Sequence, residues 1–248
     1  MRRARWVGAL AGTAVVVVLG LVAGCGAGDS LGVVGTSDPG ASTRLTGGSI
    51  PGGTGVQLEA YSLPKSGTDG AGSRSASVVA SPAAWCWAQL KLASGRSLWA
   101  VTDGAGVAQF VGVPLGSFSL TVWPPFGRSD LSPLTVTAAR TDPAADVLVL
   151  GVMGPNGSPD DGAIRLEAND TIVSPGESSD VVANVASGSV PAAGSSLAWV
   201  LETRTGAELT LDVTNVRHAV IRSGSTRGTA LVAGHFGPAS SSCTFSLR

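Results

Sequence analysis

Hydrophobic and polar residues alternate with a period of two along most of the chain after residue 55. In residues 88–92 and 117–122, every second side chain is apolar and its neighbours are polar, which is typical of strands that bury one face. The pattern predicts an all-β protein made of β-sandwiches. Further strands are expected, between turns rich in Gly, Pro and Asp, at 56–63, 97–102, 107–113, 134–139, 147–152, 164–168, 181–185, 197–201, 228–234 and 243–247.

Two segments of different composition divide the chain. Residues 25–55 are rich in Gly, Ser, Thr, Asp and Pro with isolated apolar residues, so they are predicted to form a flexible tether. An irregular first strand at residues 31–34 is the alternative. Residues 154–162 have the turn-forming composition of a short linker. We therefore expect one β-sandwich over residues 56–153 and a second over residues 163–248.

The N-terminus has the pattern of an export signal. Arg2, Arg3 and Arg5 precede residues 6–24, which carry no charge and end in small residues, as a signal peptide does. The uncharged run is close to the about 20 apolar residues that span a bilayer. An uncleaved membrane anchor is therefore the alternative to cleavage, and both interpretations place the rest of the chain outside the cytoplasm.

The end of this segment reads Leu-Val-Ala-Gly-Cys, finishing at Cys25, and it resembles the lipobox of bacterial lipoproteins. The resemblance implies that residues 1–24 are removed and that Cys25 carries two or three acyl chains, palmitate among them. Two such chains suffice for stable anchoring to a membrane. Gly26 stands where Asp would signal retention at the inner membrane, which implies delivery to the outer membrane in a cell that has one.

Within the first predicted sandwich, residues 101–122 contain Val-Thr-Asp-Gly-Ala-Gly followed by a strand and then Val-Pro-Leu-Gly-Ser-Phe. This order resembles the carboxypeptidase regulatory-like, transthyretin-type module over residues 83–152. In these turns Asp103 is expected to accept hydrogen bonds from the backbone of its own turn, and Gly106 to take a positive φ. Phe118 is expected to face the core.

The second predicted sandwich has a Pro-Gly-Glu turn at residues 175–177, a central Trp199 and a Gly-Thr-Ala strand at residues 228–230. This order resembles a bacterial immunoglobulin-like domain of the invasin type. Such a domain uses a central tryptophan to fill its core, so Trp199 is expected to be buried. Residues 209–221 fit no single strand.

The charge of the chain excludes some partners. Charged residues make up 13% of the sequence, and removing the three signal arginines from 16 basic residues leaves 13 against 17 acidic ones, a net charge of -4. The chain therefore has no net positive charge with which to attract nucleic acid or anionic lipid. The expected attachment to the membrane therefore depends on the lipid, and nucleic acid is not expected as a partner.

The sequence carries no recognisable catalytic, cofactor or metal motif. His218 and His235 are its two histidines, and neither has the spacing of a metal site. Glycine-rich phosphate loops and serine-nucleophile motifs are missing as well. We therefore expect no enzyme, no cofactor and no metal, with both histidines satisfied at the surface or at a strand edge. A Ser-His-Asp site assembled from distant residues is the alternative.

Tryptophan and cysteine supply the remaining candidates. Trp85, Trp87 and Trp123 are candidate ligand-binding residues, because two rings at i and i+2 with a third on a nearby loop offer an aromatic surface to sugar rings or to a hydrophobic partner. Filling the core of the sandwich is the alternative and the favoured interpretation. Cys86 and Cys243 are a candidate disulfide, with two buried free thiols as the default.

The export signal with its lipobox-like end, together with the module types, predicts a function class. We expect a lipid-anchored cell-envelope protein that acts as a non-catalytic binding, adhesion or spacer module. Its partners are the membrane, through the lipid anchor, and an envelope protein or glycan. A carbohydrate-binding lipoprotein and an accessory subunit of an envelope assembly or secretion machine, using exposed sheet edges, are the alternatives.

Overall fold

The computed structural model describes residues 55–64, 79–156, 163–185 and 196–248, which belong to one compact unit of the chain. Every regular element in these residues is a strand, which confirms the all-β prediction, and none of them is a helix able to span a membrane. The predicted signal peptide, Cys25 and tether lie outside the described residues, apart from residue 55. The strands are β1 (Gly55–Ser62), β2 (Ser81–Pro82), β3 (Trp87–Leu92), β4 (Ser97–Val101), β5 (Val107–Val111), β6 (Gly116–Val122), β7 (Leu134–Arg140), β8 (Asp146–Met153), β9 (Ile164–Ala168), β10 (Ile172–Val173), β11 (Ser178–Val185), β12 (Leu197–Thr203), β13 (Glu208–Leu211), β14 (His218–Arg222), β15 (Gly228–Phe236) and β16 (Ala239–Leu247).

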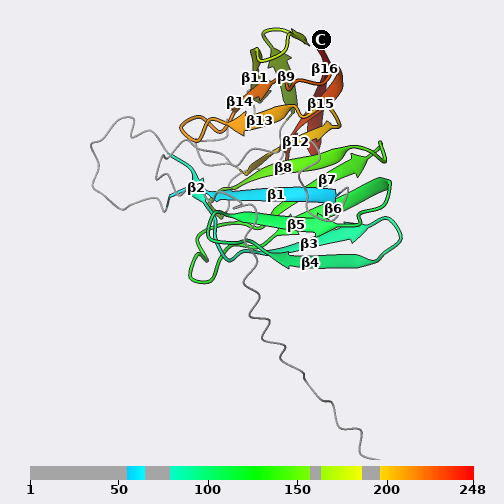
Figure 1. Cartoon of the computed structure of the whole chain (residues 1–248). Coiled ribbons are helices and arrows are strands. Elements are labelled where there is room, and N and C mark those ends of the chain that lie inside the picture. Colours follow the sequence, from blue (N-terminus) through cyan, green and yellow to red (C-terminus); the bar gives the residue numbers. More distant parts are fainter. Residues whose placement is uncertain (1–54, 65–78, 157–162, 186–195) are drawn as a thin grey trace, which may run out of the picture. The chain divides into compact units, whose positions relative to one another are not determined.

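These strands form three sheets (Figure 1). The central sheet has eight strands in the order β10-β16-β15-β12-β8-β1-β2, with β5 also paired to β1. The first cover sheet has the order β4-β3-β6-β7, and the second cover sheet has the order β13-β14-β11-β9. Strand pairs are antiparallel except for β1 with β8 and β10 with β16.

The strands at the middle of the central sheet are buried on both faces. Every residue of β1, β8 and β12 is buried. In β8, Val147 and Val149 pack with the first cover sheet, whereas Leu148 and Leu150 pack with the second. Because successive side chains of a strand point to opposite faces, the two cover sheets lie on opposite faces of the central sheet. The result is a three-layer arrangement with two hydrophobic cores.

The two predicted sandwiches share this central sheet. Strand β8 belongs to the first and β12 to the second, and they pair from Leu197 opposite Val152 to Thr203 opposite Asp146. This pairing was not predictable from the sequence, because alternation identifies strands without showing which strands are neighbours. The domain boundaries themselves remain a prediction, since residues 157–162 of the expected linker are not among the described residues.

Buried polar contacts join the two halves as well. The Glu202 carboxylate, on β12, accepts hydrogen bonds from the backbone N–H groups of Thr141 at 2.5 Å and Asp142 at 3.0 Å, in the loop between β7 and β8. The backbone N–H of Ala80 donates to the carbonyl of Val213 at 2.8 Å. The first two contacts pair the buried Glu202 carboxylate, and the third pairs buried backbone groups of Ala80 and Val213, which would be costly to leave unsatisfied.

The turn expected around Asp103 is confirmed. Its Oδ1 accepts hydrogen bonds from the backbone N–H groups of Ala105 and Val107, both at 2.9 Å. Gly106 has a φ of 79°, a conformation that glycine adopts without strain. Phe118 is buried in the core beneath the first cover sheet. The local chemistry of this segment was therefore predictable from its residue types.

An ionisable group, Glu59, lies buried on the face of β1 opposite to the first cover sheet. Its carboxylate accepts hydrogen bonds from Gln57 Nε2 at 3.2 Å and from the Tyr61 hydroxyl at 3.1 Å. Burial raises the pKa of Glu59 from 4.5 to about 7, against the opposing effect of the two hydrogen bonds, and the charge of Asp103 adds to the rise. Protonated Glu59 is therefore favoured by folding.

This raised pKa predicts that the free energy of unfolding falls as pH rises. The unfolded chain releases the Glu59 proton near pH 4.5, whereas the folded chain keeps it until about pH 7. The stabilisation is therefore complete below pH 4.5 and is lost as the pH rises through about 7. The loss is about 3 kcal/mol. Glu59→Gln keeps a neutral hydrogen-bonding side chain and removes this contribution, as measured by urea denaturation at several pH values.

The matched control is Glu167→Gln, which removes an exposed carboxylate on β9. This variant should keep the pH dependence of the wild-type protein. Equal pH dependence in the wild-type protein and Glu59→Gln would contradict the assignment of the effect to Glu59.

Candidate ligand-binding surface

The outer face of the first cover sheet is exposed to solvent. In β3, Ala88 and Leu90 point into the core, so the residues between them point outward. The register of β3 with β4 and β6 sets Trp99 and Thr121 opposite Gln89, on the same outer face. The outward positions of the four strands are Trp87, Gln89, Lys91, Ser97, Trp99, Val101, Ser117, Ser119, Thr121, Thr135, Thr137 and Ala139.

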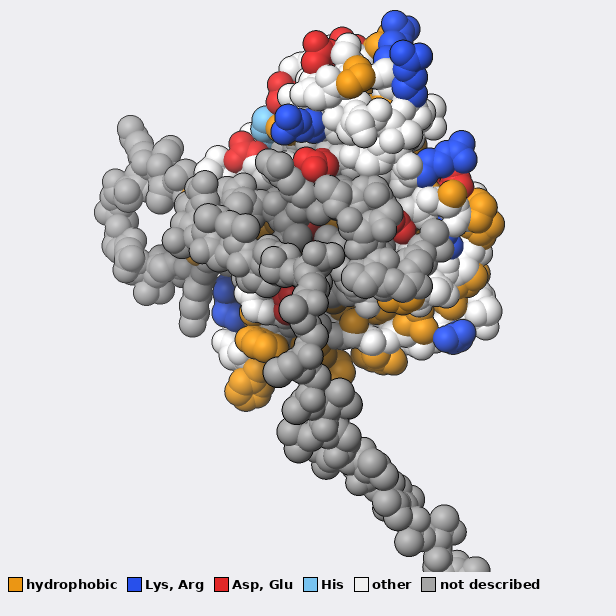
Figure 2. All heavy atoms as spheres, in the orientation of Figure 1, with side chains coloured by type: hydrophobic (Ala, Val, Ile, Leu, Met, Phe, Trp, Pro, Cys, Tyr) orange, Lys and Arg blue, Asp and Glu red, His pale blue; other side chains and the backbone are white. Residues whose placement is uncertain are grey.

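Three tryptophans on this side form a cluster that we call the tryptophan face: Trp87, Trp99 and Trp123. The rings of Trp99 and Trp123 are stacked, with centroids 5.7 Å apart and planes 17° apart, and Trp87 meets Trp99 edge-on at 6.5 Å. Trp87 is 59% exposed and Trp99 is 57% exposed. Figure 2 shows exposed hydrophobic side chains along the end of the molecule that carries β3 and β4. Such a cluster is expected at an interaction site.

The favoured interpretation that Trp85 and Trp87 fill the core is wrong. Both side chains are exposed, and the inward positions of this segment are occupied by Cys86 and Ala88, each with no exposed surface. The alternative, an aromatic surface open to a ligand, agrees with these positions.

Trp99 is a surface residue that the sequence analysis did not include among its candidates. It lies on β4, one strand away from Trp87, and completes the tryptophan face. The signal was present in the sequence, because Trp99 shares its alternation phase with Ser97 and Val101, opposite to Leu98 and Ala100. Leu98 and Ala100 pack against the core.

The expected buried tryptophan of the second half is confirmed. Trp199 has no exposed surface and lies in the core beneath the second cover sheet. Its Nε1–H donates a hydrogen bond to the carbonyl of Val216 at 3.0 Å. This partner lets the indole be buried without an unsatisfied donor.

Trp85 does not lie on a strand face with Trp87 as expected. It occupies a turn before β3 and has a φ of 62°, the only positive φ of a residue other than glycine in the described part of the chain. Buried Thr102 braces this turn: its hydroxyl donates to the carbonyl of Ala83 at 2.8 Å and accepts from the N–H of Cys86 at 2.9 Å. The fold thus holds an exposed tryptophan in a strained conformation.

This strain predicts an unusual order of stabilities at position 85. Trp85→Gly should be more stable than Trp85→Ala by about 1 kcal/mol, because glycine adopts the left-handed conformation without the clash of a Cβ. Position 87 is the control, since it lies in a strand. There the glycine variant should be less stable than the alanine variant by about 0.5–1 kcal/mol. Urea denaturation of the four variants measures both differences, and the same order at both positions would contradict the strain.

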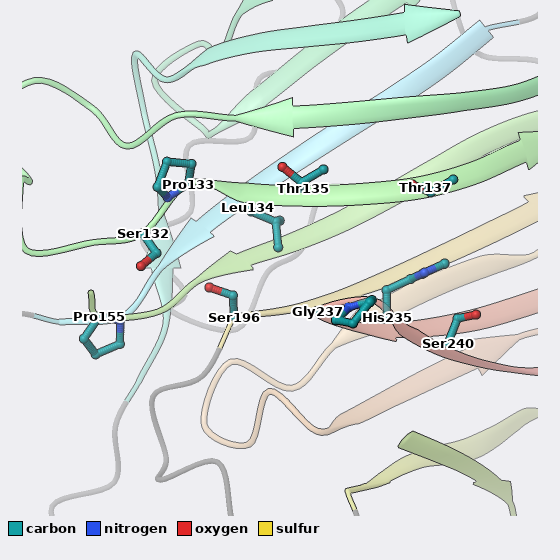
Figure 3. Close-up of a pocket in the computed structure, with 11 residues that line it drawn as sticks. Ser132, Pro133, Leu134, Thr135, Thr137, Pro155, Ser196, His235, Gly237 and Ser240 are labelled. Atoms are coloured by element: carbon teal, nitrogen blue, oxygen red, sulfur yellow. The ribbon is translucent and has the colours of Figure 1, made fainter. Parts of the chain in front are cut away.

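A pocket opens at the β7 edge of the first cover sheet, between β7 and the hairpin of β15 and β16 (Figure 3). It encloses about 560 Å³, within the usual range for ligand sites. Figure 3 shows side chains from β7, from the start of β12 and from the hairpin around the same space. The lining residues are Ser132, Pro133, Leu134, Thr135, Thr137, Pro155, Ser196, His235, Gly237, Pro238 and Ser240.

The lining of this pocket carries hydroxyl groups and no Asp, Glu, Lys or Arg. His235 is its one ionisable side chain, and burial lowers the pKa of this imidazole from its ordinary value of 6.5. His235 is therefore neutral at pH 7 and able both to donate and to accept a hydrogen bond. No described residue hydrogen-bonds this ring. The sequence contained no signal for the pocket, because its residues come from distant segments.

His218 has a different environment. Its Nε2 lies 2.9 Å from Asp180 Oδ1 and its Nδ1 lies 3.4 Å from Asp212 Oδ2. The expectation of a satisfied histidine at the surface is confirmed for His218. Both ring nitrogens contact carboxylates, so neither is placed to activate a serine. Within the described residues, no group of three or more His, Cys, Asp and Glu side chains is arranged to hold a metal ion.

The two candidate disulfide partners are free thiols in the structure. Cys86 is buried in the core beneath the first cover sheet, whereas Cys243 packs against the core beneath the second. The two cysteines therefore belong to opposite sides of the central sheet. Burial raises the pKa of the Cys86 thiol to about 11, which suppresses the reactive thiolate form.

Comparisons with known proteins add little to this picture. No protein-family model matches the sequence. No curated protein matches it either. Among solved structures, the chain is similar to the "D0-D1 domain of Intimin", with 15% sequence identity and a TM-score of 0.26 over 75% of this chain and 97% of that chain. With a TM-score this low, nothing about this chain follows from the similarity.

Proposed function

We propose that the protein is a lipid-anchored, non-catalytic binding module of the cell envelope. The segment before residue 25 and its Leu-Val-Ala-Gly-Cys ending support an anchor at Cys25, on the extracytoplasmic side of a membrane and at the outer membrane in a cell that has one. The observation that carries the binding role is the exposure of the tryptophan face. Trp87 and Trp99 keep more than half of their surface in water, although burying an indole is strongly favourable.

The tryptophan face belongs to a rigid element. Strand β3 is held between β4 and β6 by a full ladder of pairs, and its inward residues Leu90 and Leu92 are locked in the core. Because the backbone of such a strand is already fixed, binding a partner does not have to order it. This rigidity supports recognition of a partner rather than a purely spacing role.

The positions of the histidines support a role without catalysis. His218 is held between Asp180 and Asp212, and the pocket that contains His235 has no carboxylate in its lining. A serine nucleophile needs a histidine whose other nitrogen is oriented by an acidic partner. Neither described histidine offers this combination.

The lipid anchor is tested by Cys25→Ser in the full-length chain. The wild-type protein should sediment with membranes and show an acylated Cys25 at its N-terminus by mass spectrometry. Cys25→Ser should lose the acyl group and its stable membrane attachment. Cys243→Ser is the control and should stay on the membrane. An unacylated wild-type chain that keeps residues 1–24 would instead identify an uncleaved anchor.

The binding role is tested with isolated envelope material from which the lipids have been extracted, with detergent present, so that the acyl chains of the protein have no membrane to enter. The double variant Trp87→Ala, Trp99→Ala should bind this material at least about 10-fold more weakly than the wild-type protein in a sedimentation assay, as expected for the loss of central aromatic contacts. The control carries Leu115→Ala and Ile172→Ala, which remove exposed apolar side chains elsewhere, and should bind as the wild-type protein does. Equal binding by all three proteins would contradict a role for the tryptophan face.

A further inference from the structure

The chemistry of the tryptophan face and of the pocket at the β7 edge of the same sheet points to the class of ligand. We propose that together they bind a neutral polysaccharide chain of the envelope. This inference rests on the proposed binding function and specifies its partner.

The outer face of the first cover sheet offers the two kinds of contact that a sugar needs. A pyranose ring has an apolar C–H face and a rim of hydroxyl groups, so it buries best against an aromatic ring with hydrogen-bonding groups close by. Trp87 and Trp99 supply the rings, each more than half exposed. Gln89 on β3, together with Ser119 and Thr121 on β6, points outward and supplies hydrogen-bonding groups.

The absence of charge selects against other ligands. Lys91 is the only charged side chain among the outward positions of the first cover sheet, and the described pocket lining has none. An anionic polymer or a phospholipid headgroup would find no cluster of basic groups here. An uncharged ligand needs no charged partner, so the lack of basic groups does not weaken its binding to this surface.

The threonine hydroxyl groups on the outer face of the first cover sheet argue against insertion of this face into a bilayer. Thr121 and Thr135 hydroxyls lie 3.2 Å apart on the outer face, and Thr137 lies next along β7. The hydrogen bond between Thr121 and Thr135 uses one of their two hydroxyl protons, so contact with acyl chains would deprive the other of water without replacement. A sugar replaces that hydrogen bond to water.

The pocket lies at the β7 edge of the sheet that carries the tryptophan face, with β6 between β3 and β7, which suits an extended chain. Trp99 is on β4 and Trp123 follows β6, so the stacked rings reach across β3. Trp123 also follows Val122, whose partner across the sheet is Leu134 in the pocket lining. A polysaccharide that leaves the tryptophans in this direction meets Thr135 and then neutral His235.

The test uses the full-length protein in detergent micelles and polysaccharides extracted from its own envelope after proteinase treatment. Anion exchange separates these into a neutral and an anionic fraction, and water-soluble headgroups released from extracted envelope lipids by mild alkali form the third probe. We expect binding to the neutral fraction by affinity electrophoresis, with little change between about 0.05 and 0.5 M salt, because no charge pairs are screened.

Variants locate the site. Trp87→Ala with Trp99→Ala should weaken binding to the neutral fraction at least about 10-fold, and Thr135→Val with Thr137→Val should weaken it about 2- to 10-fold through lost hydrogen bonds. Thr210→Val on β13, away from this surface, is the control and should bind as the wild-type protein does. Equal binding by the wild-type protein and the tryptophan variant would overturn the proposal.

The other outcomes separate this inference from the proposed function. Binding to the anionic fraction or to the lipid headgroups, without binding to the neutral fraction, would overturn the ligand class and leave the binding function in place. Binding to untreated envelope that disappears after proteinase treatment would do the same and identify a protein partner. A protein that binds neither untreated envelope nor any fraction would overturn both.

Discussion

Burial of β1, β8 and β12 on both of their faces is the constraint on which the rest of the structure depends. Strands β8 and β12 present apolar side chains to two cores at once, so the central sheet needs a cover on either side. Removing the second cover sheet would expose Leu148 and Leu150, and removing the first cover sheet would expose Val147 and Val149. A buried side chain of this size contributes about 1.5–3 kcal/mol. The two halves of the chain are therefore held together by the same residues that form their cores.

The candidate site follows from this layering. The inner face of the first cover sheet is occupied by the core, so its tryptophans lie on the outer face. The first cover sheet has four strands and the central sheet has eight, so one face of β15 and β16 extends beyond the cover. The pocket forms where β7, the last strand of the cover, stands beside that uncovered face. His235 and Ser240 lie there, and Leu231 remains 37% exposed.

Local features of this fold were predictable and long-range features were not. Alternation in residues 88–92 and 117–122 predicted the strands, and Asp103 with Gly106 predicted a turn whose hydrogen bonds the structure contains. The phase of Leu90 and Leu92 also places Trp87 outward, but the preference of large aromatics for the core led to the opposite expectation. The strands β13 and β14 within residues 209–221 were missed. The pairing of β8 with β12 and the residues of the pocket depend on segments far apart in the sequence, where no local pattern carries information.

The proposed binding surface depends on tryptophans that face water, in contrast to Trp199, which fills a core. Hydroxyl-radical footprinting of the folded full-length chain tests this most directly, with mass spectrometry reading the oxidation rate at each tryptophan. Trp85, Trp87 and Trp99 should react at rates close to those of the unfolded chain, and Trp199 should stay protected until the chain unfolds. Protection of Trp87 and Trp99 equal to that of Trp199 would contradict the account, because those side chains would then belong to a core and no aromatic binding surface would exist.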